Sequence, residues 1–110
     1  MLTEDQILDK LCSNHMGHKK AVSVCVLVQE ILGYPGSAAD ERRVRSVVAK
    51  LRMYAYPICA HPNKGYFMGE TEEEIKETCN YLYRRAMTSL QQVSGLTRRA
   101  LPDIKGQMGL

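Results

Sequence analysis

The feature that constrains the fold most is a helical repeat that a proline brings to an end. Four apolar residues recur at the spacing of one buried helix face, namely Val44, Val47, Val48 and Leu51. We therefore expect a helix over residues 40–53, with Asp40 as its N-cap. Pro57 prevents the helix from continuing, because the residue before a proline avoids the α region. A different kind of element must follow directly.

Two short apolar runs follow Pro57 and flank a turn. Residues 58–60 and 66–68 have the composition of strands, and the five residues 61–65 between them, HPNKG, are mostly turn formers. This pattern predicts a β-hairpin with a basic, glycine-containing tip.

Two further helices are expected before residue 40. Thr3 and Gln6 form a capping-box pattern, so a first helix of about ten residues begins there. We expect a short strand at 19–22 and then a helix at 24–32, with Ser23 as N-cap. The predicted fold class is thus mostly α with a small β-hairpin (α+β), in a domain spanning residues 1–70.

A long helix is predicted after the hairpin, over residues 71–94. Thr71 and Glu74 form a second capping-box pattern, and apolar residues then recur at spacings of four and three. This seam either packs back onto the small domain or pairs with its copy in a second chain, and the small size of the domain favours a homodimer. The seam residues are Ile75, Cys79, Leu82, Ala86, Leu90 and Val93. Residues 95–110 are expected to be a mobile tail.

Composition narrows the functional class. The 110 residues suffice for one domain, and the net charge of +3 is a weak argument for a polyanionic partner, although basic residues cluster at 42–52 and acids at 70–77. No apolar run approaches the ~20 residues of a membrane span and no signal peptide is evident, so a cytoplasmic protein without a membrane partner is expected. No catalytic motif is present. We expect no enzyme, no catalytic residue, no cofactor and no small-molecule substrate.

The cysteines are widely spaced and form no C-x-x-C pair. We expect four free thiols that act as small buried hydrophobes. Cys12, His15 and His18 recur at every third residue and offer a weak alternative, a metal site that lacks a fourth ligand. The favoured interpretation of this segment is a helix end followed by a polar loop, without metal.

The exposed face of the 40–53 helix carries the functional prediction. Small residues at its centre allow close approach to base edges, and the flanking cations reach phosphates or guanine. The alternative is an ordinary solvated basic face. The candidate DNA-binding residues on this helix are Arg42, Arg43, Arg45, Ser46, Ala49 and Lys50.

Three helices followed by a hairpin resemble the winged helix-turn-helix domains of the biotin-repressor type. The resemblance covers residues 3–68 and is specific only from Leu51 to Met68, where the chain reads L-R-x-x-x-x-P-I-x-x-x-P-x-K-G-Y-F-M. It implies double-stranded DNA binding, with residues 40–53 as recognition helix and His61, Asn63 and Lys64 of the wing on the backbone. A small dimeric regulator or replication-associated factor, of the kind phages and mobile elements carry, is the expected function. The alternative is a winged-helix module that binds protein.

Overall fold

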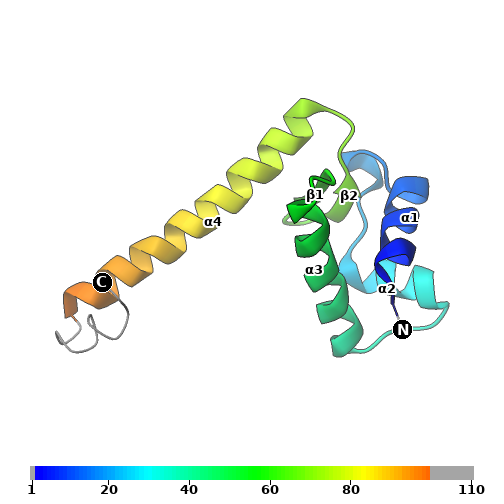
Figure 1. Ribbon diagram of the computed structural model, residues 1–110, viewed down its shortest axis with the longest axis horizontal. Coiled ribbons are helices and arrows are strands. Elements are labelled where there is room, and N and C mark those ends of the chain that lie inside the picture. Colours follow the sequence, from blue (N-terminus) through cyan, green and yellow to red (C-terminus); the bar gives the residue numbers. More distant parts are fainter. Residues whose placement is uncertain (1, 100–110) are drawn as a thin grey trace. The chain divides into compact units, whose positions relative to one another are not determined.

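The structure is a computed structural model that describes residues 2–99 (Figure 1). The chain divides into two compact units, Met1–Thr78 and Cys79–Leu110, which are described separately. The predicted mobile tail lies mostly at 100–110, outside the described residues, but residues 95–99 are helical. The elements in chain order are α1 (Glu4–Asn14), a short 3-10 turn (His18–Lys20), α2 (Val24–Leu32), α3 (Ala38–Met53), β1 (Ile58–His61), β2 (Gly65–Met68) and α4 (Glu72–Arg99).

The predicted fold class is confirmed, because the described residues are mostly helical with one antiparallel hairpin, β1–β2. Local sequence accounts for the helix starts. The Thr3 hydroxyl accepts from the Gln6 amide and the Gln6 side chain accepts from the Thr3 amide, which completes the predicted capping box of α1. Ser23 caps α2, which ends at Gly33 in the left-handed conformation. No described helix has the length and apolarity needed to cross a membrane.

The core of the Met1–Thr78 unit lies where the three helices meet the hairpin. α1, α2 and α3 contact one another, and the hairpin contacts α1 and α3. The buried face of α3 is the predicted one, because all four residues of the repeat are at most 4% exposed. The core residues are Leu2, Ile7, Leu11, Val22, Leu27, Val28, Val44, Val47, Val48, Leu51, Ile58 and Met68.

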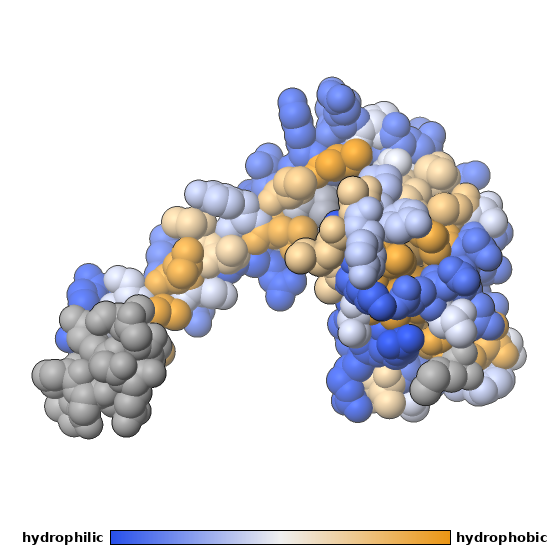
Figure 2. Space-filling view, in the orientation of Figure 1, coloured by the Kyte–Doolittle hydropathy of each residue, from blue (hydrophilic) through white to orange (hydrophobic). Residues whose placement is uncertain are grey.

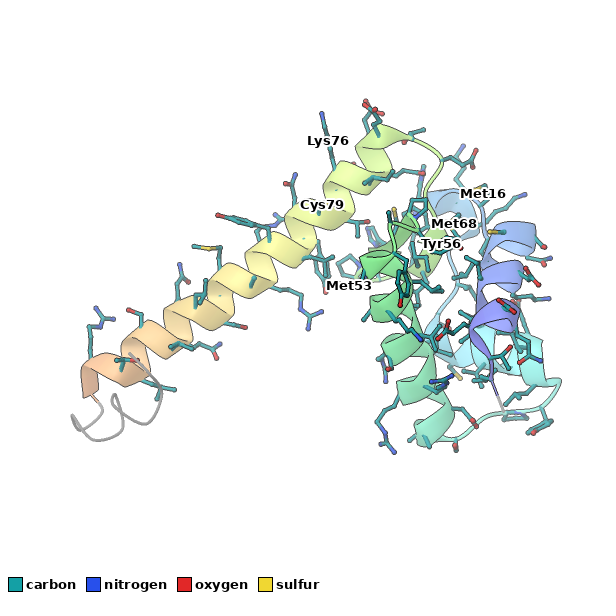
Figure 3. All side chains as sticks on the ribbon, viewed as in Figure 1. Met16, Met53, Tyr56, Met68, Lys76 and Cys79 are labelled. Atoms are coloured by element: carbon teal, nitrogen blue, oxygen red, sulfur yellow. The ribbon has the colours of Figure 1, made fainter. Side chains whose placement is uncertain are left out.

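β2 is bordered by chain on both sides. It pairs with β1 from Ile58↔Met68 to His61↔Gly65, and its other edge meets residues 16 and 22 through two isolated bridges, Met16↔Met68 and Val22↔Tyr66. Met16 and Met68 lie near one another in Figure 3. The predicted strand at 19–22 is therefore wrong. His18–Lys20 form a 3-10 turn, and within residues 19–22 only Val22 has a backbone hydrogen bond to β2.

Gly65 allows this close approach. It has a φ of 98°, and a Cβ placed there would lie 2.1 Å from the carbonyl oxygen of Val22. Only glycine adopts such a backbone conformation without strain, and it also leaves room for the neighbouring chain.

α3 begins two residues earlier than predicted. Its N-cap is Ser37, whose hydroxyl accepts from the Asp40 amide, while the Asp40 carboxylate accepts from the Ser37 amide. The predicted N-cap Asp40 is instead the third residue of α3 and the last residue of a capping box. The hydrogen bonds from Ser37 lower the pKa of its carboxyl.

The end of α3 is a tight reversal. The amide of Tyr56 donates to the carbonyl of Leu51 and the amide of Ala55 donates to that of Arg52, which is the hydrogen-bond pattern of a Schellman motif. Ala55 occupies the left-handed position with a φ of 71°, where glycine is the usual residue.

α4 starts from a well-bonded first turn inside the Met1–Thr78 unit. The predicted Thr71–Glu74 capping box is present, and the Glu74 carboxylate also accepts from the amides of Glu70 and His18 and lies 2.8 Å from Nδ1 of His18. These hydrogen bonds, first that from the Glu70 amide, lower the pKa of Glu74 from 4.5 to about 2. The Thr78 hydroxyl, in the next turn, accepts from the amide of Ala60.

α4 is longer than the predicted helix. It continues through Gly95 to Arg99, whereas the sequence indicated an end at residue 94. A glycine in a helix interior costs only about 1 kcal/mol relative to alanine, which the remaining residues of a 28-residue helix can offset.

Candidate nucleic-acid interface

The outward face of α3 opposes its buried face. Arg42, Ser46 and Ala49 are exposed, and Met53 at the end of this stripe is 87% exposed. The guanidinium of Arg42 has no hydrogen bond or ion pair to any residue that the structure describes. Two small side chains between Arg42 and Met53 leave the helix backbone accessible to a flat or convex ligand.

One flank of α3 is tied to the N-terminal segment. Nε of Arg43 donates to the carbonyl of Leu2 at 3.2 Å, and Nζ of Lys50 lies 2.5 Å from Oε1 of Glu4. The hydrogen bond to Glu4 raises the pKa of Lys50. Both side chains are exposed as predicted, but each already has an intrachain partner, so they are less available to a ligand than Arg42.

The opposite flank of α3 faces the hairpin. Arg45 forms a loose ion pair with Glu41, at 3.7 Å, and its side chain remains 54% exposed. Arg52 is half-buried, and its Nε donates to the carbonyl of Ile58 at 2.7 Å. This bond joins the last turn of α3 to β1 and positions the hairpin beside the helix. No local sequence pattern predicts this role for Arg52, because its partner Ile58 lies beyond the end of the helix.

The hairpin tip presents one cation. Asn63 and Lys64 are exposed, and the turn is closed by the Lys64 amide, which donates to the carbonyl of His61. Nδ1 of the half-buried His61 accepts from the Asn63 amide. His61 therefore shapes the turn with one ring nitrogen. The Lys64 ammonium group has no hydrogen bond or ion pair among the residues in the described range.

The nine predicted DNA-binding residues therefore fall on two elements. Six lie along α3 and three at the tip of the hairpin, and none is in the core. Among these nine residues, Arg42, Arg45 and Lys64 are the exposed cations whose side chains have the fewest or longest contacts within the chain. Sequence spacing alone did not distinguish them from Arg43 and Lys50, because the partners Leu2 and Glu4 are more than 40 residues away.

Three large apolar side chains are exposed at the carboxyl end of α3. Met53, Tyr54 and Tyr56 are 87%, 66% and 43% exposed, and Figure 3 shows Met53 and Tyr56 at the carboxyl end of α3. These three large apolar side chains lie within four residues of one another in the chain, and exposed apolar side chains of this size are available for contact with another molecule. We refer to these three residues as the α3 end patch.

The predicted seam of α4 is exposed along its length. Ile75 and Leu82 are each 38% exposed, Leu90 is 59% and Val93 is 36%, while Cys79 and Ala86 are also exposed. In Figure 2, hydrophobic side chains gather along α4.

Charge divides unevenly between the two units. Residues 1–78 hold ten Lys and Arg against eleven Asp and Glu, whereas residues 79–110 hold five against one. The net charges are therefore −1 and +4, which together give the +3 of the whole chain. The net charge of residues 1–78 therefore does not attract a polyanion to α3.

The histidines of the described range each have their own hydrogen-bond partner. Buried His15 bridges the carbonyl of Lys20 and Oε1 of Glu30, at 2.8 and 2.6 Å, while His18 pairs with Glu74. No group of three His, Cys, Asp or Glu within residues 2–99 could hold a metal. Cys12, Cys25 and Cys79 are free but exposed, so their predicted burial is wrong, and only Cys59 is buried.

Comparisons with protein-family models, with curated proteins and with solved structures found no match for this chain.

Proposed function

We propose that this protein binds double-stranded DNA through a winged helix-turn-helix formed by α2, α3 and the β1–β2 hairpin. The observation that carries the proposal is the outward face of α3, where Arg42 and Arg45 flank the small residues Ser46 and Ala49. A helix with small residues at its centre fits the major groove, and arginine binds phosphate oxygens or the guanine edge. Lys64 at the hairpin tip supplies a backbone contact.

The proposal includes a homodimer formed through the seam of α4, as in many DNA-binding proteins with paired half-sites. It is supported by the exposed apolar residues at Leu82, Leu90 and Val93. The biological role is that of a small regulator or replication-associated factor acting in the cytoplasm.

A second candidate function is protein binding without DNA. The α3 end patch and the net charge of −1 over residues 1–78 favour it. Binding of a protein through this patch would depend little on salt, whereas DNA binding would depend on it strongly.

A fluorescence anisotropy titration of a random-sequence duplex tests the proposal. We expect affinity to fall by orders of magnitude between about 50 mM and about 200 mM salt. Arg42→Ala, Arg45→Ala and Lys64→Ala should each reduce the salt slope by about 0.9. Lys50→Gln, which removes a cation already paired with Glu4, is the matched control and should change the slope less.

Two outcomes contradict DNA binding. Wild-type protein that does not bind duplex even at the lower salt would favour the protein-binding candidate. Equal salt slopes for wild type and for all three alanine variants would remove α3 and the hairpin tip from the interface.

A further inference from the structure

The Cys79–Arg99 part of α4 has a composition that its predicted role as a dimer helix does not explain. It holds four arginines and no acidic residue. Solvated helix faces normally mix both signs of charge. Cations near a helix C-terminus also interact with the helix dipole, but that effect is confined to the last turn. It accounts for Arg98 and Arg99 and leaves Arg84 and Arg85, in the middle of the helix, unexplained.

Arg84 and Arg85 belong to a defined surface. A shallow hollow of about 400 Å³ is lined by both arginines together with Tyr81, Thr88 and Ser89. The guanidinium carbon of Arg85 lies 5.7 Å from the centroid of the Tyr81 ring, which is within the range of a cation–π contact. This contact holds the Arg85 side chain beside the hollow. We refer to these five residues as the α4 basic face.

The polar groups of the α4 basic face suit an anion. Both guanidinium groups are exposed, and neither forms an ion pair with any residue that the structure describes. The Thr88 hydroxyl donates to the carbonyl of Arg84, so its proton is already used. The Ser89 hydroxyl has no hydrogen bond within the described range and remains a donor. Arginine forks match the geometry of phosphate oxygens.

The α4 basic face and the apolar seam lie on different sides of the helix. At about 100° per residue, the side chains of Arg84 and Arg85 project about 180° and about 80° away from the centre of the seam around Leu82, Ala86 and Val93, and Ser89 is the member of the α4 basic face nearest to the seam. A helix that pairs with a second copy through its seam would therefore still present Arg84 and Arg85 to solvent.

We propose that the α4 basic face is a second phosphate-binding surface, which contacts the nucleic-acid backbone without reading its sequence. This proposal rests on the DNA binding proposed above for α3. It also supplies what the Met1–Thr78 unit lacks, because that unit has a net charge of −1 and the cations of α4 provide the attraction to a polyanion.

The test compares three double variants of the full chain in the duplex titration at several salt concentrations. Arg84→Gln with Arg85→Gln removes both charges, Arg84→Lys with Arg85→Lys retains them, and Gln91→Ala with Gln92→Ala controls for changes elsewhere on α4. We expect the glutamine pair to reduce the salt slope by about 1.8 and to weaken binding at about 50 mM salt at least fivefold. The lysine pair should retain the wild-type slope, and the alanine control should match wild type.

Sedimentation and circular dichroism of each variant separate this surface from the seam and from helix folding. If the Arg84→Gln, Arg85→Gln variant keeps the wild-type salt slope while Arg42→Ala reduces it, the α4 basic face does not bind phosphate. DNA binding by α3 is then unaffected. The phosphate-binding role of the α4 basic face is also contradicted if the loss of affinity accompanies dissociation into monomers or a loss of helicity. Wild-type protein that binds no duplex removes both proposals together.

Discussion

The unit Met1–Thr78 packs many of its large apolar side chains into a buried core, whereas the Cys79–Arg99 part of α4 leaves its apolar seam exposed. Leu27 in α2 is fully buried, while Leu82 and Leu90 in α4 are 38% and 59% exposed. Charges differ in the same way, since several cations of the first unit form ion pairs within the chain, whereas Arg84 and Arg85 of the α4 basic face form none with any described residue. The first region thus uses its side chains to stabilise a fold, and the second leaves them available to other molecules.

Alanine substitution of one glycine in each region should give the largest difference in unfolding free energy between the two regions. Gly65→Ala forces a Cβ against the Val22 carbonyl at a φ of 98°, so we expect it to lower the free energy of unfolding by at least about 4 kcal/mol. Gly95→Ala meets no atom within 4 Å and should increase helicity, worth about 0.5 to 1 kcal/mol. Urea unfolding and circular dichroism measure the two effects. A Gly65→Ala protein as stable as wild type would contradict the close approach of residue 22 to β2.

Alanine substitution of one leucine in the core and one in the seam compares their contributions to the free energy of unfolding. Leu27→Ala should cost about 3 kcal/mol of unfolding free energy, because it leaves a cavity in the core. Leu82→Ala should cost less than about 0.5 kcal/mol in the monomer and should instead raise the dimer dissociation constant in sedimentation equilibrium.

A loss at Leu82 equal to that at Leu27 would mean that the seam is core within one chain, which is the alternative that the sequence left open. Wild-type protein that sediments as a monomer at all concentrations would exclude the dimer.

Glu74 stabilises the start of α4, and we expect its substitution to lower the free energy of unfolding less than those of Gly65 and Leu27. Glu74→Gln should lower stability at pH 7 by about 1 to 2 kcal/mol, because the amides it caps lose a charged acceptor. The pKa of Glu74 falls from 4.5 to about 2 on folding, so the carboxylate stabilises the fold above pH 4.5 and loses this effect as the pH falls toward 2.

The difference in stability between wild type and Glu74→Gln should therefore narrow between pH 4.5 and pH 2 in denaturant titrations. Glu73→Gln, which removes a charge from the same turn, is the control. A difference that stays constant across this range would show that Glu74 does not cap the helix.

Most elements of the fold were predictable because their causes are local. Capping boxes span four residues, and the α3 repeat marks its own buried face, so Thr3, Ser23 and Thr71 were identified as caps without knowledge of the fold. The start of α3 was missed because Ser37 and Asp40 are both good N-cap residues, and only the hydrogen bonds show which one caps.

The features that the sequence did not predict depend on distant partners. Nothing in the sequence around residues 19–22 shows that only Val22 pairs with β2, since its partner Tyr66 lies far along the chain. The intrachain contacts of Arg43 and Lys50 are equally distant, so the positions of the candidate DNA-binding residues were predicted but their availability was not. Whether these residues contact DNA stays a prediction.

The pairing of Val22 with Tyr66 also has a consequence for hydrogen exchange. Each amide donates to the other residue's carbonyl, at 2.8 and 2.7 Å, and the two residues come from segments that the whole of α2 and α3 separates. An opening that exposes one amide must therefore expose the other, and it must detach the chain before α2 from the hairpin. Their two protons should exchange at a common slow rate that reports the opening of the entire Met1–Thr78 unit.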